Sequence, residues 1–269
     1  MKESDSRRPS GADRAEPGVA FAGSSPGAPF RGLGDSALQS ETLESLASVK
    51  NYHAWLTDLA LPHLGDHPLE LGSGLGDYAR AWLDAGVPQL TLTDLDPVRS
   101  ALLHSRFESE PRIQVAQLDI FDPPEACYSS LVAFNVLEHI EDHVGALRAS
   151  HRLLVPGGAV IIFVPAFTFA MGRFDHAVGH FRRYTKRTLR AAYDAAGLEI
   201  EKIQYVNAPG LIAWFLAVRV LRMTPRDGIA VQLWDRTITR ATRAVERRVA
   251  LPFGQSVFAV GRTSRWSDR

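Results

Sequence analysis

A glycine-rich stretch between Leu69 and Gly76 is the strongest chemical signal in the sequence. It lies between an expected short strand, residues 68–71, and an expected helix, residues 78–85. Glycines at such a junction let the backbone approach a ligand closely, because they lack Cβ and accept positive φ. A dinucleotide-binding loop needs Gly-x-Gly-x-x-Gly, but here the third glycine comes one residue early and Asp77 takes its place. An acid there would repel pyrophosphate, so the loop favours a cofactor without phosphates.

Three acids around this loop indicate the kind of cofactor. Asp94 follows the second expected strand, residues 90–93, where an acid accepts hydrogen bonds from ribose hydroxyls. Glu70 and Asp77 flank the loop and make an acidic setting that suits a cationic sulfonium and an α-amino group. The alternative is an ordinary tight turn, which the strand, loop, helix and Asp94 together disfavour.

A second stretch, residues 174–190, gathers imidazoles, a carboxylate, guanidiniums and a phenol. It follows the fifth expected strand, residues 159–164, so it projects from the edge of the sheet where open α/β folds bind ligands. The residues expected to bind the substrate are Asp175, Arg182 and Arg183, and those expected to be catalytic are His180 and Tyr184. The alternative is a polar loop that caps the next helix, with Thr185 as the N-cap.

His139 follows the fourth expected strand, residues 130–135, and is the third candidate catalytic residue. Histidine titrates near neutral pH, so His139 is suited to remove a proton from an acceptor. Alternatively, Glu138 and His139 only close the turn between strand and helix. The acids and histidines at positions 138–143 are also potential metal ligands, but near-consecutive spacing points their side chains in different directions. We therefore expect no metal site.

The elements that must position these residues alternate between strand and helix, which predicts an α/β fold with a doubly wound parallel sheet. We expect a disordered leader over residues 1–37 and a cofactor-binding domain over residues 38–206. Residues 207–269 are expected to add a helical insertion and a last strand to the same domain. The cofactor-binding domain is expected to open with an amphipathic helix, residues 39–61, that ends at Pro62.

Composition limits the class of protein. With 269 residues, 45% of them hydrophobic, the chain can build one substantial core. A single cysteine excludes an intrachain disulfide, and no apolar signal-peptide region is visible, so we expect a cytoplasmic protein. The longest apolar run, residues 208–218, is shorter than the ~20 residues of a membrane span. Within it, the segment 211–216 is expected to be a buried helix; the alternatives are a cover for a bulky apolar acceptor or a contact with a membrane surface.

The charges are unevenly distributed although the formal net charge is zero. Residues 1–170 contain 12 Lys and Arg against 22 Asp and Glu, whereas residues 171–269 contain 18 against 8. A basic third indicates an anionic partner, and the alternative is a solvated surface that offsets the acidic part. No recognised nucleic-acid module accompanies it, so we expect no nucleic-acid partner. The sequence leaves the oligomeric state open.

Five segments resemble, in order, the motifs of class I S-adenosylmethionine-dependent methyltransferases of the ubiquinone type. They are Leu69–Tyr78, Thr93–Pro97, Gln117–Ile120, Phe134–Ile140 and Leu153–Gly158. The resemblance covers roughly residues 50–205 and implies a Rossmann-like, mostly parallel seven-stranded sheet. The stretch from Asp175 to Tyr184 further resembles bacterial methyltransferases encoded beside polyprenyl-phosphate glycosyltransferases.

The same resemblance implies S-adenosylmethionine as the cofactor and gives it a set of contacts. The implied cofactor-binding residues are Glu70, Gly72, Ser73, Gly74, Gly76, Asp94, Leu95, Asp119, Ile120 and Asn135. Glu70 would lie near the amino-acid end, Asp94 at the ribose and Asn135 near the transferred methyl group. Asp119 and Ile120 would frame the adenine. Asp96 departs from the family, which often has a small polar residue there.

The resemblance implies methyl transfer to a small molecule, and we expect O-methylation of a natural-product, lipid-linked or glycosyl intermediate. One alternative is a non-catalytic cofactor-binding subunit, and another is a nicotinamide-dependent oxidoreductase, which the early third glycine opposes. We expect the acceptor to be anionic and held by Arg182 or Arg183, because a planar guanidinium bonds two oxygens at once. The competing view is that both arginines only pair with acids of the N-terminal part.

Overall fold

The computed structural model describes residue 38 and residues 49–125, 127–220 and 229–264. The chain divides into two compact units, residues 1–30 and 31–269, and every described residue belongs to the second. The leader expected over residues 1–37 and residues 39–48 of the first expected helix lie outside the described residues.

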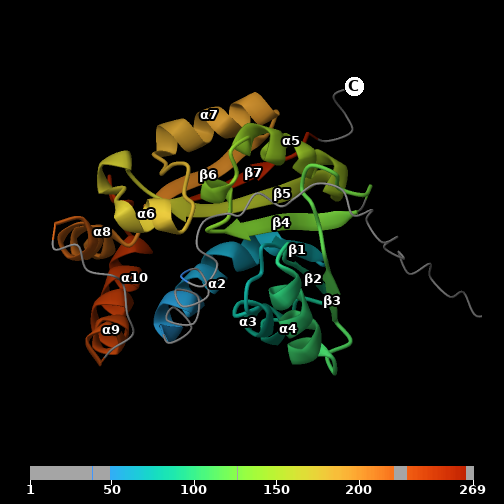
Figure 1. Ribbon diagram of the computed structural model, residues 1–269, viewed down its shortest axis with the longest axis horizontal. Coiled ribbons are helices and arrows are strands. Elements are labelled where there is room, and N and C mark those ends of the chain that lie inside the picture. The colour runs from blue at the N-terminus through green and yellow to red at the C-terminus, as the bar shows by residue number, and fades with distance from the viewer. Residues whose placement is uncertain (1–37, 39–48, 126, 221–228, 265–269) are drawn as a thin grey trace, which may run out of the picture. The chain divides into compact units, whose positions relative to one another are not determined.

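A seven-stranded sheet forms the centre of this unit, with the strand order β3-β2-β1-β4-β5-β7-β6 (Figure 1). Strands β1 to β5 are parallel to their neighbours, and β7 is antiparallel to both β5 and β6. The expected doubly wound, mostly parallel sheet is therefore confirmed. The strands are β1 (Pro68–Leu71), β2 (Leu90–Thr93), β3 (Ile113–Ala116), β4 (Tyr128–Phe134), β5 (Leu154–Pro165), β6 (Glu199–Val206) and β7 (Ser256–Arg262).

Helices pack on both faces of the sheet, and alternate strand residues supply a core for each face. Val160 and Ile162 of β5 belong to the cluster that includes α5 and α7, whereas Ile161 and Phe163 belong to the cluster with α2, α3 and α4. The helices are α2 (Lys50–Leu64), α3 (Ala79–Asp84), α4 (Pro97–Phe107), α5 (His143–Leu153), α6 (Arg173–Ala177), α7 (Lys186–Ala196), α8 (Ala208–Trp214), α9 (Ile229–Trp234) and α10 (Arg240–Glu246). Burial on both faces explains why β5 reads as a continuous apolar run.

Several expected boundaries differ from the structure: β4 spans Tyr128–Phe134 instead of 130–135 and α3 spans Ala79–Asp84 instead of 78–85, and two larger differences have a physical cause. Helix α2 continues past Pro62 to Leu64 and ends at Gly65, whose φ is 72°. A proline in the last turn removes one backbone hydrogen bond, and the complete burial of Leu64 favours the extra turn. Strand β5 begins at Leu154 rather than at Ala159, because Tyr128 pairs with Leu154 before the register shifts to the pair of Ser130 and Ala159. The Pro-Gly-Gly turn is thus included in an irregular strand.

The C-terminal helical segment includes two π-helical stretches, Phe215–Val220 and Asp235–Thr239. The Asp235 carboxylate accepts hydrogen bonds from the backbone N–H groups of Asn51 and Tyr52, both at 2.9 Å, and so ties this segment to the start of α2. The expected burial of the apolar segment 211–216 holds only in part, because Ile212 and Leu216 are 55% and 51% exposed. Among the described residues, no helix is both long enough and apolar enough to cross a membrane.

Candidate cofactor and acceptor site

The glycine loop directly follows β1 and leads into α3. Gly72, Gly74 and Gly76 have φ angles of 68°, 57° and 73°. A Cβ atom on Gly72 would lie 2.7 Å from Val136 Cγ2, and one on Gly76 would lie 2.7 Å from Phe107 Cε2. The loop therefore requires glycine both for its dihedral angles and for space.

Ser73 and Asp94 join the loop to the end of β2. The Ser73 N–H donates to the Thr93 carbonyl at 2.7 Å, and the Gly74 N–H donates to Asp94 Oδ2 at 3.0 Å. The second Asp94 oxygen accepts the Asp96 N–H at 2.9 Å, and burial raises the pKa of this carboxyl. An ionised carboxylate accepts about four hydrogen bonds. Asp94 thus keeps capacity for two hydroxyl donors at the carboxyl end of β2.

Glu70 is an acid buried within β1, with 3% of its surface exposed. Its Oε2 atom has no hydrogen-bond partner among the described residues. Burial is the main cause that raises the pKa of Glu70 to about 8; a hydrogen bond with Ser73 opposes the rise, and the charges of Asp77 and Asp94 contribute to it. A buried acid with one unpartnered oxygen, next to two other acids, favours a cationic ligand group.

The predicted adenine-contacting segment lies after β3. The exposed Asp119 accepts the Phe121 N–H at 2.9 Å through Oδ1, while Ile120 is buried. Gln117 donates to the Leu95 carbonyl at 3.2 Å, which connects the loops that follow β2 and β3. The structure therefore brings these predicted residues to the same edge of the sheet as Asp94.

Asn135 and Asp96 complete this edge. Asn135 directly follows β4, has a positive φ of 54° and an exposed side chain, and its N–H donates to the Phe163 carbonyl at 2.8 Å. Asp96 is the N-cap of α4, because its Oδ1 accepts the Val98 N–H at 2.9 Å. The departure of Asp96 from the family pattern is thereby explained by a helix cap.

These features fit S-adenosylmethionine. A cradle of glycines that admits no Cβ allows close backbone approach, and the orphaned Glu70 carboxyl suits an ammonium group. Asp94 has free acceptor capacity for a ribose. The acidic surroundings suit a sulfonium cation better than a phosphate.

Asp175 organises the loop after β5. It is fully buried and accepts the His180 Nδ1–H at 2.8 Å and the Arg183 Nε–H at 2.7 Å through the same oxygen, Oδ1. Its Oδ2 accepts the Gly172 N–H at 2.8 Å. Burial alone would raise the pKa of Asp175, but the bonds from His180 and Arg183 hold it at about 2. In this structure Asp175 positions two other side chains and does not face solvent.

The two neighbouring arginines differ in their surroundings. Arg183 is buried, pairs with Asp175, and lies 5.1 Å over the Trp214 ring. Arg182 is half-buried and donates to the backbone carbonyls of Ile140 and Glu141. Within the part of the chain that the structure describes, neither arginine forms an ion pair with an acid of the N-terminal part, although the charge of Arg183 lowers the pKa of Glu138. Of the two, only Arg182 has a guanidinium near solvent.

Tyr184, expected to be catalytic, is 1% exposed. Its hydroxyl lies 3.4 Å from the Leu137 carbonyl oxygen and 3.2 Å from His143 Nδ1. Burial raises the pKa of this phenol above its ordinary value. Tyr184 therefore supports the turn that carries Glu138 and His139 and does not reach an acceptor in this structure.

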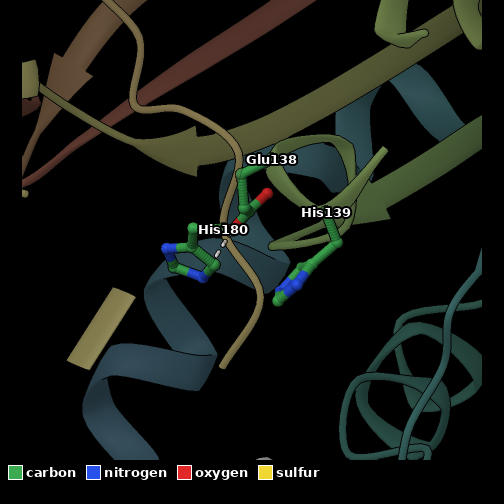
Figure 2. Close-up of side chains that lie close together, drawn as sticks. All are labelled: Glu138, His139 and His180. Carbon is green, nitrogen blue, oxygen red and sulfur yellow. Dashed lines mark ion pairs between the residues drawn. The ribbon is translucent and has the colours of Figure 1, made fainter. Parts of the chain in front are cut away.

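Three titratable side chains converge beside this turn: Glu138 and His139 from the 3₁₀ turn η1 (Leu137–His139), and His180 from the loop after α6 (Figure 2). The Phe181 N–H donates to the Glu138 carbonyl at 2.9 Å and holds the two segments together. The rings of His139 and His180 are 4.6 Å apart. Burial raises the pKa of Glu138 to about 7, and burial together with the charge of His180 lowers the pKa of His139 to about 3.

From the sequence, Glu138 was expected either to close the turn or, as the disfavoured alternative, to belong to a metal cluster of residues 138–143. The structure makes it the buried centre of the cluster, with His180 Nε2 at 3.9 Å from its Oε1 atom. An acid beside a histidine at the end of a strand was the available signal. The approach of His180 was not predictable from spacing, because it depends on how the later loop folds back.

Comparisons with known proteins agree with this geometry. A family model described as a methyltransferase domain matches residues 50–203. A probable S-adenosylmethionine-dependent methyltransferase of Mycolicibacterium smegmatis is 29% identical over 142 residues, which cover 51% of this chain and 53% of that protein. A ubiquinone biosynthesis O-methyltransferase of Paracidovorax citrulli is 27% identical over 143 residues, which cover 49% of this chain and 58% of that protein. The chain thus matches little more than half the length of these relatives.

A solved structure shares the fold. Phosphoethanolamine N-methyltransferase 2 of Haemonchus contortus, in complex with S-adenosylmethionine, aligns with a TM-score of 0.54 and 16% identity. The alignment covers 78% of this chain and 53% of that one. Since the family model matches more than half of the chain and the glycine loop, Asp94 and the strand order agree with it, the chain belongs to the class I S-adenosylmethionine-dependent methyltransferases.

Proposed function

We propose that this protein methylates a hydroxyl oxygen of a small molecule, such as a natural-product, lipid-linked or glycosyl intermediate. The observation that carries the proposal is the cluster of Glu138, His139 and His180 beside Asn135, at the carboxyl end of β4. A hydroxyl acceptor must lose a proton, and this cluster brings proton acceptors to the edge of the sheet where the cofactor residues lie.

When bound, S-adenosylmethionine supplies a methyl group that is already activated by the positive sulfur. The protein's own residues then bind the cofactor and orient it toward the acceptor. Glu70 holds the cationic amino group, Asp94 holds the ribose, and the glycine loop allows close approach. His180, whose Nδ1–H is bound by Asp175, keeps Nε2 directed toward Glu138. The His139 ring lies 4.6 Å from that of His180, and its lowered pKa keeps it neutral.

We further propose that the acceptor carries a phosphate or carboxylate and that Arg182 binds it. Its guanidinium has five N–H donors, and the bonds to Ile140 and Glu141 leave others available. Arg183 is not suited to this role, because its charge is matched by the buried Asp175. Of the two arginines expected to bind the anionic group, Arg182 is therefore the one proposed for this role.

The test is methyl transfer from isotopically labelled S-adenosylmethionine into a metabolite extract of the host, followed by mass identification of the labelled product. We expect one labelled small molecule and an equal amount of S-adenosylhomocysteine. A protein that binds S-adenosylhomocysteine but labels nothing in the extract would favour a non-catalytic subunit. Label on nitrogen or carbon would contradict O-methylation.

Once the acceptor is known, Arg182→Lys tests the anionic group. Lysine keeps the charge but loses the planar fork, so we expect at least a tenfold higher acceptor KM and unchanged affinity for S-adenosylhomocysteine. The matched control is Arg187→Lys, an exposed position on α7. An unchanged KM for Arg182→Lys would remove the support for an anionic acceptor.

A further inference from the structure

The cluster of Glu138, His139 and His180 has the composition of a metal-binding site. Each residue offers one ligand atom, and these atoms all lie within 4.8 Å of one another. They come from two segments that the Phe181 N–H joins to the Glu138 carbonyl. The site is thus assembled by the fold and does not depend on consecutive residues.

Three polar atoms of the cluster have no hydrogen-bond partner among the described residues, whereas His180 Nδ1 bonds to Asp175 and the His139 ring also interacts with the backbone at Val178 and Gly179. Glu138 is 0% exposed, and neither of its carboxylate oxygens has a hydrogen-bond partner among the described residues. The buried Nδ1 atom of His139 also has none. An unsatisfied buried carboxylate costs several kcal/mol or more, so buried acids are normally paired or coordinate a metal.

One ring nitrogen of His180, Nδ1, is already hydrogen-bonded to Asp175. Its Nδ1–H donates to Asp175 at 2.8 Å, so that in the neutral ring the lone pair is on Nε2, which lies 3.9 Å from Glu138 Oε1. A histidine held by a carboxylate through one nitrogen is the usual arrangement of a metal ligand, because it fixes the tautomer and makes the other nitrogen more basic.

The spacing between these atoms distinguishes a cation from a shared proton. A direct hydrogen bond between nitrogen and oxygen needs about 2.7–3.2 Å. Two ligands of a tetrahedral ion with bonds of about 2.0–2.1 Å are about 3.3 Å apart. The separation of 3.9 Å between His180 Nε2 and Glu138 Oε1 is that of an ion pair and is too long for the first, and the three ligand atoms, which lie within 4.8 Å of one another, would close toward about 3.3 Å around an ion.

We propose that Glu138, His139 and His180 bind a divalent transition-metal ion, with zinc as the first candidate. Two imidazoles and one carboxylate suit zinc, whereas magnesium prefers oxygen ligands. Three protein ligands leave a coordination position open, as in catalytic zinc sites. The expected absence of a metal considered only residues 138–143, and His180 supplies the missing ligand from another loop.

This site deepens the proposed function, and the catalytic part of the inference rests on it. A hydroxyl bound at the open position releases its proton to solvent more readily, because the cation stabilises the oxygen anion. The oxygen electron pair forms the bond to the methyl carbon, while the carbon–sulfur bond breaks and leaves its pair on sulfur. The products are the methyl ether, S-adenosylhomocysteine and one proton.

The experiment uses the full chain without a histidine tag, stripped with a chelator and titrated with Zn²⁺ by calorimetry and with Co²⁺ by visible absorption. We expect one ion per chain and the intense bands of a four-coordinate cobalt site. His180→Gln and Glu138→Gln should each weaken Zn²⁺ binding at least tenfold. The control His176→Gln, at an exposed histidine of the neighbouring helix α6, should bind normally.

Affinity for S-adenosylhomocysteine serves as the test of folding for each variant, since its site is made by other residues. Absence of stoichiometric binding of either ion, or equal weakening by His176→Gln, would overturn the metal site. If Glu138→Gln loses affinity for S-adenosylhomocysteine and is therefore misfolded, the Zn²⁺ affinity of His180→Gln alone decides whether the metal site exists. Full methyl transfer by the stripped protein would overturn the catalytic part while the proposed function stands. Zinc binding without methyl transfer would leave the site intact and refute the proposed function.

Discussion

At the scale of a single residue, Asp94 joins two turns and is expected to bind the cofactor. Its two oxygens accept N–H groups from Gly74 and Asp96, and its remaining acceptor capacity faces the edge where a ribose would lie. Asp94→Asn keeps the size of the side chain but replaces an acceptor oxygen by a donor. Hydrogen bonds to a charged group contribute about 1.5–3 kcal/mol each.

We therefore expect Asp94→Asn to weaken binding of S-adenosylhomocysteine at least tenfold by calorimetry, with a far-UV circular dichroism spectrum like that of the wild type. Asp122→Asn, an exposed acid in the loop before β4, is the matched control and should bind normally. An unchanged dissociation constant for Asp94→Asn would show that the ribose is held by another residue.

Glu70 gives the free protein a pH dependence of opposite sign to that of most paired acids. Its pKa is about 8 in the folded protein against an ordinary 4.5, so the unfolded chain loses this proton first as the pH rises. The folded state then binds more protons than the unfolded state between about pH 4.5 and pH 8, and Glu70 lowers the free energy of unfolding across that window.

Glu70→Gln removes this titration. Relative to the wild type, we expect the variant to gain at least ~1 kcal/mol of stability between pH 5 and pH 8 in urea unfolding, because one pKa unit corresponds to about 1.4 kcal/mol. The same variant should bind S-adenosylhomocysteine more weakly at pH 8, since the carboxylate that attracts the amino group is gone. A stability difference independent of pH would contradict the burial of an acid without a partner.

At the scale of elements, the sequence was most informative where one physical signal dominates. The bounds of β1 and β2 agree with the expected ones, because apolar runs and glycine breaks coincide there. The end of α2 and the start of β5 were not predictable in this way. Tertiary burial of Leu64 and a register shift beside Tyr128 decided them.

The candidate site was predictable in the same uneven way. The residues expected to bind the cofactor lie at the ends of four neighbouring parallel strands, so topology alone brings them together. Asp175, Arg183 and Tyr184 were identified as chemical residue types, but burial turns them into supports. Nothing in the spacing distinguishes Arg182 from Arg183, because their different surroundings arise from contacts with Ile140, Asp175 and Trp214.

The glycine loop between β1 and α3 leaves no room for a Cβ atom at Gly76, and this can be tested by substitution. A Cβ on Gly76 would lie 2.7 Å from Phe107 and 2.9 Å from Leu103, whereas one on Gly86 would meet nothing within 4 Å. Both glycines have positive φ, so alanine at either position costs about 1–2 kcal/mol in backbone strain. Only Gly76→Ala adds overpacking, which typically costs a further 1–3 kcal/mol, about as much again.

We expect Gly76→Ala to lose about 2–5 kcal/mol in urea unfolding and to bind S-adenosylhomocysteine more weakly. Gly86→Ala, which has the strain without the contact, should lose about half as much and keep its affinity. Equal losses for the two variants would show that the loop adapts to a Cβ and that only the backbone angles require glycine.

At the scale of the whole molecule, the excess of basic residues lies in the last third of the sequence, where the C-terminal helices expose apolar side chains. Ile229 and Leu233 of α9 are 87% and 60% exposed. Arg236 and Arg240 follow on the same helical segment and are also exposed. Apolar and cationic side chains on one exposed segment are typical of helices that lie on an anionic membrane surface.

A lipid-linked acceptor would require such a contact, and it can be measured without knowing the acceptor. We expect the protein to sediment with vesicles of phosphatidylglycerol and phosphatidylcholine in equal parts, and to dissociate as the salt rises from ~0.1 M to ~0.5 M, because each basic residue at the surface contributes only about 1 kcal/mol and is screened. Pure phosphatidylcholine vesicles should bind much less. The double variant Ile229→Asp, Leu233→Asp should lose most of the binding, whereas Leu102→Asp, at an apolar position on α4 that is 52% exposed, should not. Equal loss in both variants, or no binding to anionic vesicles, would refute the membrane contact and leave these helices as a cover for a soluble acceptor.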